Sequence, residues 1–171
     1  MNRRNRTDSG VGRLLVDASF AVYQNAKSQS GSVGLFGDGV VFAKSKKQTI
    51  VSKSSTEAEI VALSDNASEA IEYLNFLRSQ GIMLDEPMVI EQDNQSAMLM
   101  VERGKTHNPV SKHINVRYFF IKDRIDSGEI KLVYVPTEDL LADILTKPLQ
   151  GLRFRQLRDR LLNRRKEDIK E

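Results

Sequence analysis

The stretch SKSSTEAEIVALSDNASEA, residues 52–70, begins as a polar run and continues as a segment with apolar residues at helical spacing. Two glutamates lie where the two parts meet. Ser54 precedes Glu57 by three positions, which is the spacing of a capping box at a helix start. Thr56 stands in the same relation to Glu59, and only one of the two pairs can occupy the start of the helix. One glutamate is therefore left over, and the rest of the chain must decide whether it is a solvated acid or a functional one.

Strand patterns lie on both sides of this helix. Before it, three strands are predicted, with GDG as a hairpin turn between the second and third: RLLVDASFAVY (13–23), SVGLFG (32–37) and VVFAK (40–44). After it come a strand, two helices, a last strand and C-terminal helices broken near Pro148: PMVIEQD (87–93), NQSAMLMVERG (94–104), HINVRYFFIKDRIDSG (113–128), EIKLVYV (129–135), EDLLADILTKPL (138–149) and LRFRQLRDRLLNRR (152–165). This order predicts an α/β domain.

Length and composition limit the possibilities further. The 171 residues suit one domain, which we expect at 13–163, with a basic tail at 1–12 and a charged tail at 164–171. No segment has the roughly 18 consecutive apolar residues of a membrane span, so no membrane partner is expected. The absence of cysteine excludes disulfides and thiolate metal sites, and it suits a cytoplasmic location.

The charge is unevenly distributed although the net charge is only +3. One basic group lies near the C-terminus, and a smaller one precedes residue 54. Such groups are typical of phosphate-binding surfaces and also of solvated faces, so both interpretations stay open. The C-terminal group comprises Arg153, Arg155, Arg158, Arg160, Arg164, Arg165 and Lys166, and the other group comprises Lys44, Lys46, Lys47 and Lys53.

Four acids occupy positions where a site is expected. Asp17 ends the apolar LLV of the first predicted strand and Asp93 ends the MVIEQ of the fourth, and ligands of open α/β sheets bind at the carboxyl ends of strands. Asp143 lies on the apolar side of the predicted helix after the last strand, where an acid is costly unless it is paired. Glu59 lies in the first turns of the long helix. Each acid alone has an ordinary turn or surface interpretation, but their joint placement favours a carboxylate cluster.

The chain resembles the ribonuclease H domain of the polyproteins of copia-type LTR retrotransposons. The likeness runs from Leu14 to Arg160 and rests on VDAS, SKKQTIVSKSSTEAEIVAL, EQDNQSA, KHINVRYFFIKD and KLVYVPTEDLLADILTKPL. It implies a ribonuclease H-like fold with a five-stranded mixed sheet and flanking helices. It also implies four catalytic, metal-binding carboxylates in chain order, which here are Asp17, Glu59, Asp93 and Asp143. Because AEIVA matches the family's pattern around the helix glutamate, the spare acid is Glu59, and Glu57 is the cap with Ser54.

The same resemblance implies the chemistry. The expected cofactor is a pair of Mg²⁺ ions, with Mn²⁺ as a substitute, because these hard cations prefer oxygen ligands. The implied reaction is endonucleolytic hydrolysis of the RNA strand of an RNA/DNA hybrid, leaving 5′-phosphate and 3′-hydroxyl ends. The expected protein partner is the reverse transcriptase domain of the same polyprotein. Polar residues beside the acids are candidates for contacts to 2′-hydroxyl groups: Ser55, Thr56, Asn94 and Gln95.

One departure from the family pattern concerns a histidine. Many ribonucleases H carry one between the fifth strand and the last aspartate, whereas VPTEDLLAD has none. Glu138 or Asp139 can take part of that role, but an N-cap at Thr137 with both acids in the first turn is the stronger interpretation. We interpret His113 as structural or substrate-facing. A catalytically weak module that binds nucleic acid or reverse transcriptase is the main alternative. An integrase-type nuclease is disfavoured because its glutamate comes last in the chain.

Overall fold

The structure is a computed structural model that describes residues 12–82, 86–103 and 112–164. Its centre is a five-stranded sheet in the order β3-β2-β1-β4-β5. The first three strands pair antiparallel, and β1, β4 and β5 pair parallel, so the predicted mixed sheet is confirmed. The strands are β1 (Gly12–Ser19), β2 (Gln29–Phe36), β3 (Gly39–Lys47), β4 (Met88–Gln92) and β5 (Ile130–Tyr134).

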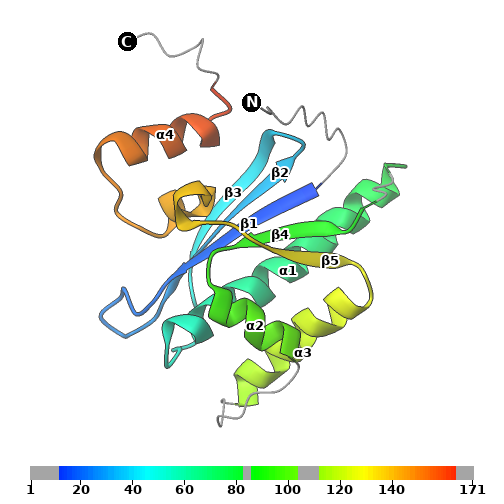
Figure 1. The fold of residues 1–171 in the computed structure, drawn as a ribbon, viewed down its shortest axis with the longest axis horizontal. Helices are drawn as coiled ribbons and strands as arrows, with labels where there is room; N and C mark the ends of the chain where they lie inside the picture. The colour runs from blue at the N-terminus through cyan, green and yellow to red at the C-terminus, as the bar shows by residue number, and fades with distance from the viewer. Residues whose placement is uncertain (1–11, 83–85, 104–111, 165–171) are drawn as a thin grey trace.

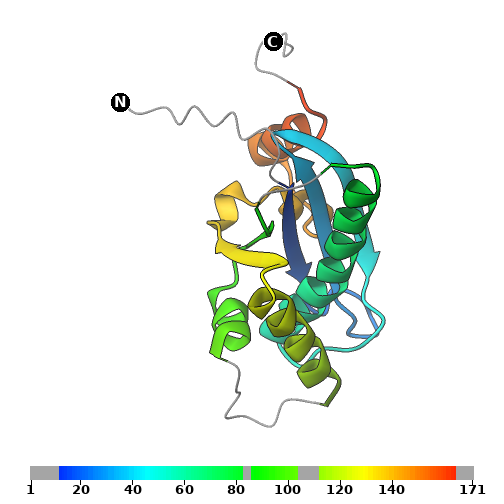
Figure 2. The same ribbon diagram turned by 90° about the vertical axis from the view of Figure 1, so that its right-hand side faces the viewer.

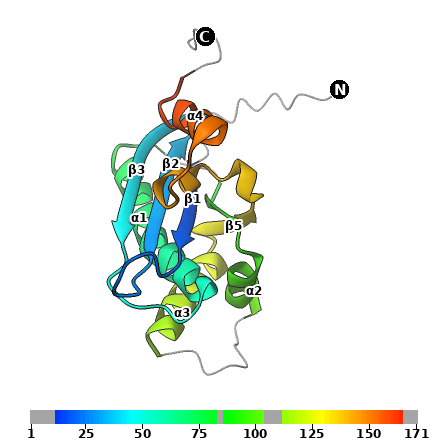
Figure 3. The same ribbon diagram turned by 90° about the vertical axis from the view of Figure 1, so that its left-hand side faces the viewer.

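Helices cover both faces of this sheet (Figure 1). The long helix α1 packs on β1 and β2, and α3 packs on α1 and β5. Figure 2 shows α1 lying along the sheet for most of its length. Figure 3 shows the chain after β5 passing between β5 and α4. The elements are α1 (Ser55–Ser79), α2 (Gln95–Arg103), α3 (Lys112–Asp126), the 3₁₀ helices η1 (Thr137–Asp139) and η2 (Leu141–Leu145), and α4 (Gly151–Leu161).

Alternation along β1 divides the core in two. Leu14 and Val16 face α1 and join the larger apolar cluster, which extends to α3 and β5. Leu15 points to the other face and packs in a smaller cluster with β2, η2 and α4. Asp17 is two residues beyond Leu15 and therefore points to the same face as η2.

Helix α1 begins as the capping interpretation predicts. The Ser54 hydroxyl accepts a hydrogen bond from the Glu57 backbone N–H at 3.2 Å, and the Glu57 carboxylate accepts one from the Lys53 N–H at 2.8 Å. Gly81, in a left-handed conformation with φ of 77°, follows the helix end. Because Glu57 is occupied by the cap, the sheet-facing acid of this helix start is Glu59, which is buried.

Two predicted elements differ from the structure. The first strand ends at Ser19 rather than continuing to residue 23, because Ala21 adopts a positive φ of 51° that breaks the extended backbone. The predicted helix over 138–149 is wrong in type. The chain there forms two 3₁₀ helices, η1 and η2, separated by Leu140 with an extended backbone at φ −75° and ψ 104°. Among the described residues, no helix is both long and apolar enough to cross a membrane.

Candidate active site at the carboxyl ends of β1 and β4

Strand pairing brings the first two acids together. In the parallel ladder Leu14 is paired with Ile90 and Leu15 with Glu91. Two residues further along, the same register sets Asp17 beside Asp93, which directly follows β4. Parallel strands end at the same edge of a sheet, so both carboxylates reach the same solvent-facing corner.

The third acid, Asp143, comes from η2. Carboxylate oxygens of Asp17, Asp93 and Asp143 all lie within 4.8 Å of one another. Asp17 and Asp143 are buried and Asp93 is half-buried. Three carboxylate oxygens at this separation are the kind of donor set that Mg²⁺ and Mn²⁺ prefer. The residues therefore fit the ions that the sequence predicts.

Gly31 on β2 allows η2 to lie this close to the sheet. It is the partner of Asp17 in the antiparallel ladder. A Cβ atom at this position would lie 2.7 Å from Thr146 Cγ2 and 2.9 Å from Leu145 Cβ. Any larger residue would push η2, and with it Asp143, away from β1. The sequence gives no local signal for this requirement, because the contact spans more than a hundred residues.

The protonation of Asp17 reflects its burial. Its side chain is 1% exposed, and desolvation raises the pKa of Asp17 from its usual 3.8 to about 6. The hydrogen bond from Thr146 and the positive charge of Lys147 oppose this rise in pKa, whereas the charges of Asp143 and Asp93 add to it. A bound cation would offset the cost of burying the charged carboxylate.

Glu59 is near Asp17 and Asp93 but is not one of the three acids whose carboxylate oxygens lie within 4.8 Å of one another, and it is held by Gln92. Burial, followed by the charges of Asp17 and Asp93, raises the pKa of Glu59 well above its usual value. The Gln92 amide donates to Glu59 Oε2 at 3.0 Å. The Gln92 side-chain oxygen, Oε1, accepts from the backbone N–H groups of Asp93 at 2.7 Å and Asn94 at 3.1 Å. Gln92 is fully buried, so it fixes Glu59 relative to the turn that carries Asp93.

Two threonines that sequence reasoning missed bind the aspartates directly. The Thr137 hydroxyl donates to Asp93 Oδ2 at 2.7 Å, and the Thr146 hydroxyl donates to Asp17 Oδ2. The predicted N-cap at Thr137 is therefore wrong: Pro136 is the cap residue of η1, and no side chain caps this helix. Thr146 belongs to ADILTKPL, part of a motif that carries the family resemblance. The motif marks the segment as part of the domain but does not indicate that Thr146 contacts Asp17.

Basic side chains reach the same cluster. Lys147 Nζ lies 2.7 Å from Asp143 Oδ1 and 3.3 Å from Asp17 Oδ1. Arg153 of α4 lies 3.6 Å from Asp143 Oδ2. Burial alone would lower the pKa of Lys147, but the hydrogen bond to Asp143 and the charges of Asp17, Asp143 and Asp93 raise it overall. Lys147 is therefore a cation in this arrangement.

The predicted substrate-contacting residues surround the acids at two helix starts. Ser55 and Gln95 are exposed first residues of α1 and α2, and Thr56 is half-buried. Asn94 also has a structural role, because its Oδ1 accepts from the Ala97 backbone N–H at 2.9 Å and so caps α2. Its side-chain N–H groups make no hydrogen bond to the residues that the structure describes.

The side chains of the residues considered in place of the missing histidine are exposed. Glu138 and Asp139 are exposed in η1, and their backbone carbonyls accept hydrogen bonds from Arg153 and Arg160. His113 is exposed near the start of α3. The other histidine, His107, lies outside the described residues.

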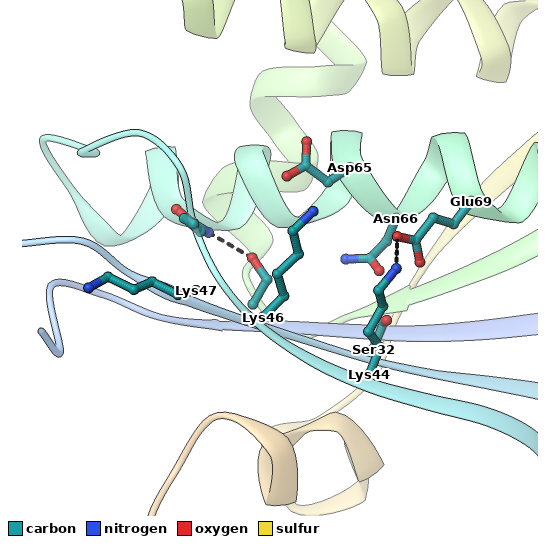
Figure 4. Close-up of a pocket in the computed structure, with 9 residues that line it drawn as sticks. Ser32, Lys44, Lys46, Lys47, Asp65, Asn66 and Glu69 are labelled. Atoms are coloured by element: carbon teal, nitrogen blue, oxygen red, sulfur yellow. Dashed lines mark hydrogen bonds and ion pairs between the residues drawn. The ribbon is translucent and has the colours of Figure 1, made fainter.

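Many of the predicted phosphate-binding cations pair within the chain. Arg158 and Arg164 both form ion pairs with Asp159, while Arg165 and Lys166 lie outside the described residues. On β3, Lys44 pairs with Glu69 across a polar pocket between the strand and α1, and Lys46 extends toward Asp65 (Figure 4). Lys47 lies over the ring of Tyr23, with Nζ 4.1 Å from its centroid. The side chains that line that pocket carry charges of both signs.

Comparisons with known proteins agree with this geometry. No protein-family model matches the chain. The retrovirus-related Pol polyprotein from transposon RE2 of Arabidopsis thaliana is 38% identical over 127 residues, which are 74% of this chain and 9% of that polyprotein. The chain thus spans less than a tenth of this relative's length.

Solved structures share the fold. RNase H1 from the halophilic archaeon Halobacterium salinarum NRC-1 superposes with a TM-score of 0.58 and 19% identity, covering 80% of this chain and 95% of that one. The foamy viral protease-reverse transcriptase in complex with an RNA/DNA hybrid superposes with a TM-score of 0.59 and 16% identity, covering 85% of this chain and 21% of that one. By sequence and by fold, the chain belongs to the ribonuclease H domains of retrotransposon Pol polyproteins.

Proposed function

We propose that this domain hydrolyses the RNA strand of RNA/DNA hybrids with two Mg²⁺ ions held by Asp17, Glu59, Asp93 and Asp143. The observation that carries the proposal is the convergence of Asp17, Asp93 and Asp143, whose carboxylate oxygens lie within 4.8 Å of one another. When bound there, the ions would activate the attacking water and stabilise the leaving 3′-oxygen of the scissile phosphodiester.

The protein's own residues would prepare the site for this chemistry. Thr137 and Thr146 orient Asp93 and Asp17 by donating a hydrogen bond to one oxygen of each carboxylate, and the other oxygen of Asp17 lies 3.3 Å from the Lys147 ammonium. Gln92 holds the Glu59 carboxylate against the same corner. Burial of Asp17 and Glu59 makes their charged forms costly without a cation, so binding of a divalent ion removes that cost.

The proposed substrate and partner follow from the relatives. The foamy viral protein of the same fold was solved with an RNA/DNA hybrid, and it joins this domain to a reverse transcriptase. We infer that this domain acts on the same class of duplex, next to the reverse transcriptase domain of its own polyprotein in the cytoplasm. We propose that Ser55, Thr56, Gln95 and the side-chain amide of Asn94 contact 2′-hydroxyl groups of the RNA strand.

The test is cleavage of a hybrid labelled on its RNA strand. Wild-type protein with Mg²⁺ is expected to produce internal cuts with 5′-phosphate ends, and to leave the DNA strand and a DNA duplex intact. Asp17→Asn and Asp93→Asn should abolish cleavage, whereas Asp126→Asn, which changes an exposed acid on α3, should not. Hybrid binding by the wild type without Mg²⁺-dependent cleavage would contradict the proposal and favour the binding module.

A further inference from the structure

Lys147 has an environment that differs from that of the other lysines in the described chain. Its ammonium lies between two buried carboxylates, 2.7 Å from Asp143 Oδ1 and 3.3 Å from Asp17 Oδ1. The two aspartate side chains are 5% and 1% exposed, respectively, whereas the lysine side chain is 34% exposed. The positive charge beside the two aspartates therefore belongs to a lysine side chain that is still partly exposed to solvent.

The backbone around Lys147 is held at several points. Its N–H donates to the Asp143 carbonyl at 3.0 Å, at the end of η2. The preceding Thr146 donates to Asp17 Oδ2 and lies 3.3 Å from the same Asp143 carbonyl. These bonds fix the base of the lysine side chain, so its flexible stem can move while its starting point does not.

We propose that Lys147 is an internal counter-ion that holds Asp17 and Asp143 together in the metal-free protein and leaves them when Mg²⁺ binds. This inference rests on the proposed metal site. The lysine contacts Oδ1 of each of two predicted ligands, so a cation that uses these two oxygens takes the place of the ammonium. Arg153 contacts the other oxygen of Asp143 at 3.6 Å and is not required to move in this exchange.

The exchange has two measurable consequences. Without metal, Lys147 reduces the repulsion among the acids and stabilises the fold. With metal, it is a competitor, because its ion pairs with Asp143 and Asp17 must be broken before an ion can use those oxygens. Lys147 is therefore a positioning residue, and removing it should weaken the metal-free fold while strengthening Mg²⁺ binding.

The test combines calorimetric titration with Mg²⁺ and thermal unfolding of the whole chain. Lys147→Met should unfold at a lower temperature than wild type in EDTA, and the difference should disappear at saturating Mg²⁺. Its Mg²⁺ dissociation constant should be roughly three- to tenfold lower than that of the wild type. Lys122→Met is the matched control, because Lys122 forms an i,i+4 pair with Asp126 on the surface of α3. It should leave the Mg²⁺ affinity unchanged.

A third variant distinguishes loss of the positive charge from a general folding defect. Lys147→Arg keeps the charge and should retain more of the metal-free stability than Lys147→Met. Equal or weaker Mg²⁺ binding by a folded Lys147→Met protein would overturn the proposal, as would an unchanged unfolding temperature in EDTA. If neither wild type nor Lys147→Met binds Mg²⁺ in a way that Asp17→Asn removes, the metal site itself fails. The EDTA comparison still measures the counter-ion effect in that case.

Discussion

Asp17 is a buried acid at the end of an apolar run of sequence. It extends the apolar LLV of β1, and its side chain is 1% exposed. Burial raises the pKa of Asp17 to about 6 from 3.8. Between these two values the folded protein binds a proton that the unfolded chain has already released. By linkage, the stability of the metal-free fold falls as pH rises through this window and stays lower above it.

This sign gives a prediction for Asp17→Asn. The variant cannot ionise at residue 17, so its stability relative to wild type should increase from pH 4 to pH 7, by an amount on the order of 3 kcal/mol. Urea denaturation of both proteins in EDTA at several pH values measures the difference. Parallel stability curves across that range would show that burial does not control the protonation of Asp17. Saturating Mg²⁺ should reverse the ranking at neutral pH, because only the wild type retains a complete set of ligands.

The start of α1 places two acids in different environments, one in the helix cap and one buried near the aspartates. Glu57 accepts a hydrogen bond from the Lys53 N–H, and its own N–H donates to Ser54, so both partners belong to the helix cap. Glu59, two residues later, is buried against Gln92 and the aspartates. The two glutamates differ in position by about half a helical turn, which directs one to the cap and the other to the sheet edge.

Paired substitutions test this division. Glu57→Ala should reduce the free energy of unfolding by about 1 kcal/mol and leave hybrid cleavage near the wild-type rate, because it removes only part of the cap. Glu59→Gln should reduce cleavage by more than roughly 100-fold, since it removes a predicted metal ligand. It should not destabilise the metal-free fold, because the charged form of Glu59 is costly there. Thermal unfolding and initial cleavage rates measure both effects. The opposite pattern would assign the catalytic role to Glu57.

The segment that carries Asp143 shows where local sequence patterns fail. Apolar spacing in EDLLADILTKPL predicts an α-helix, but the extended backbone at Leu140 divides the segment into η1 and η2. The buried leucines of this segment pack in the smaller apolar cluster, which includes Leu15, Val33 and Leu157 from three other elements. Tertiary packing therefore determines the backbone here, and local propensity does not.

For the whole molecule, the order of strands along the chain, the capped helix α1 and the identity of the clustered aspartates could be predicted from the sequence. Strand ends are local features, so Asp17 and Asp93 could be read from apolar runs. The hydrogen bonds that orient the acids could not, because they join distant positions: 129 residues separate Thr146 from Asp17, and 44 separate Thr137 from Asp93. The contacts of Gln92 with Glu59 and of Lys147 with Asp17 also join distant positions, and neither residue type alone indicates them.

We propose that Asp17, Asp93 and Asp143 form a divalent metal site at the ends of β1 and β4. Crystals of the domain soaked in Mn²⁺ test this most directly through the anomalous scattering of the ion. We predict a peak bounded by these carboxylates, with metal–oxygen distances of about 2.0–2.2 Å and the Lys147 ammonium displaced from Asp143. A map at saturating Mn²⁺ with no peak at the three aspartates, and with Lys147 still paired to Asp143, would contradict the claim.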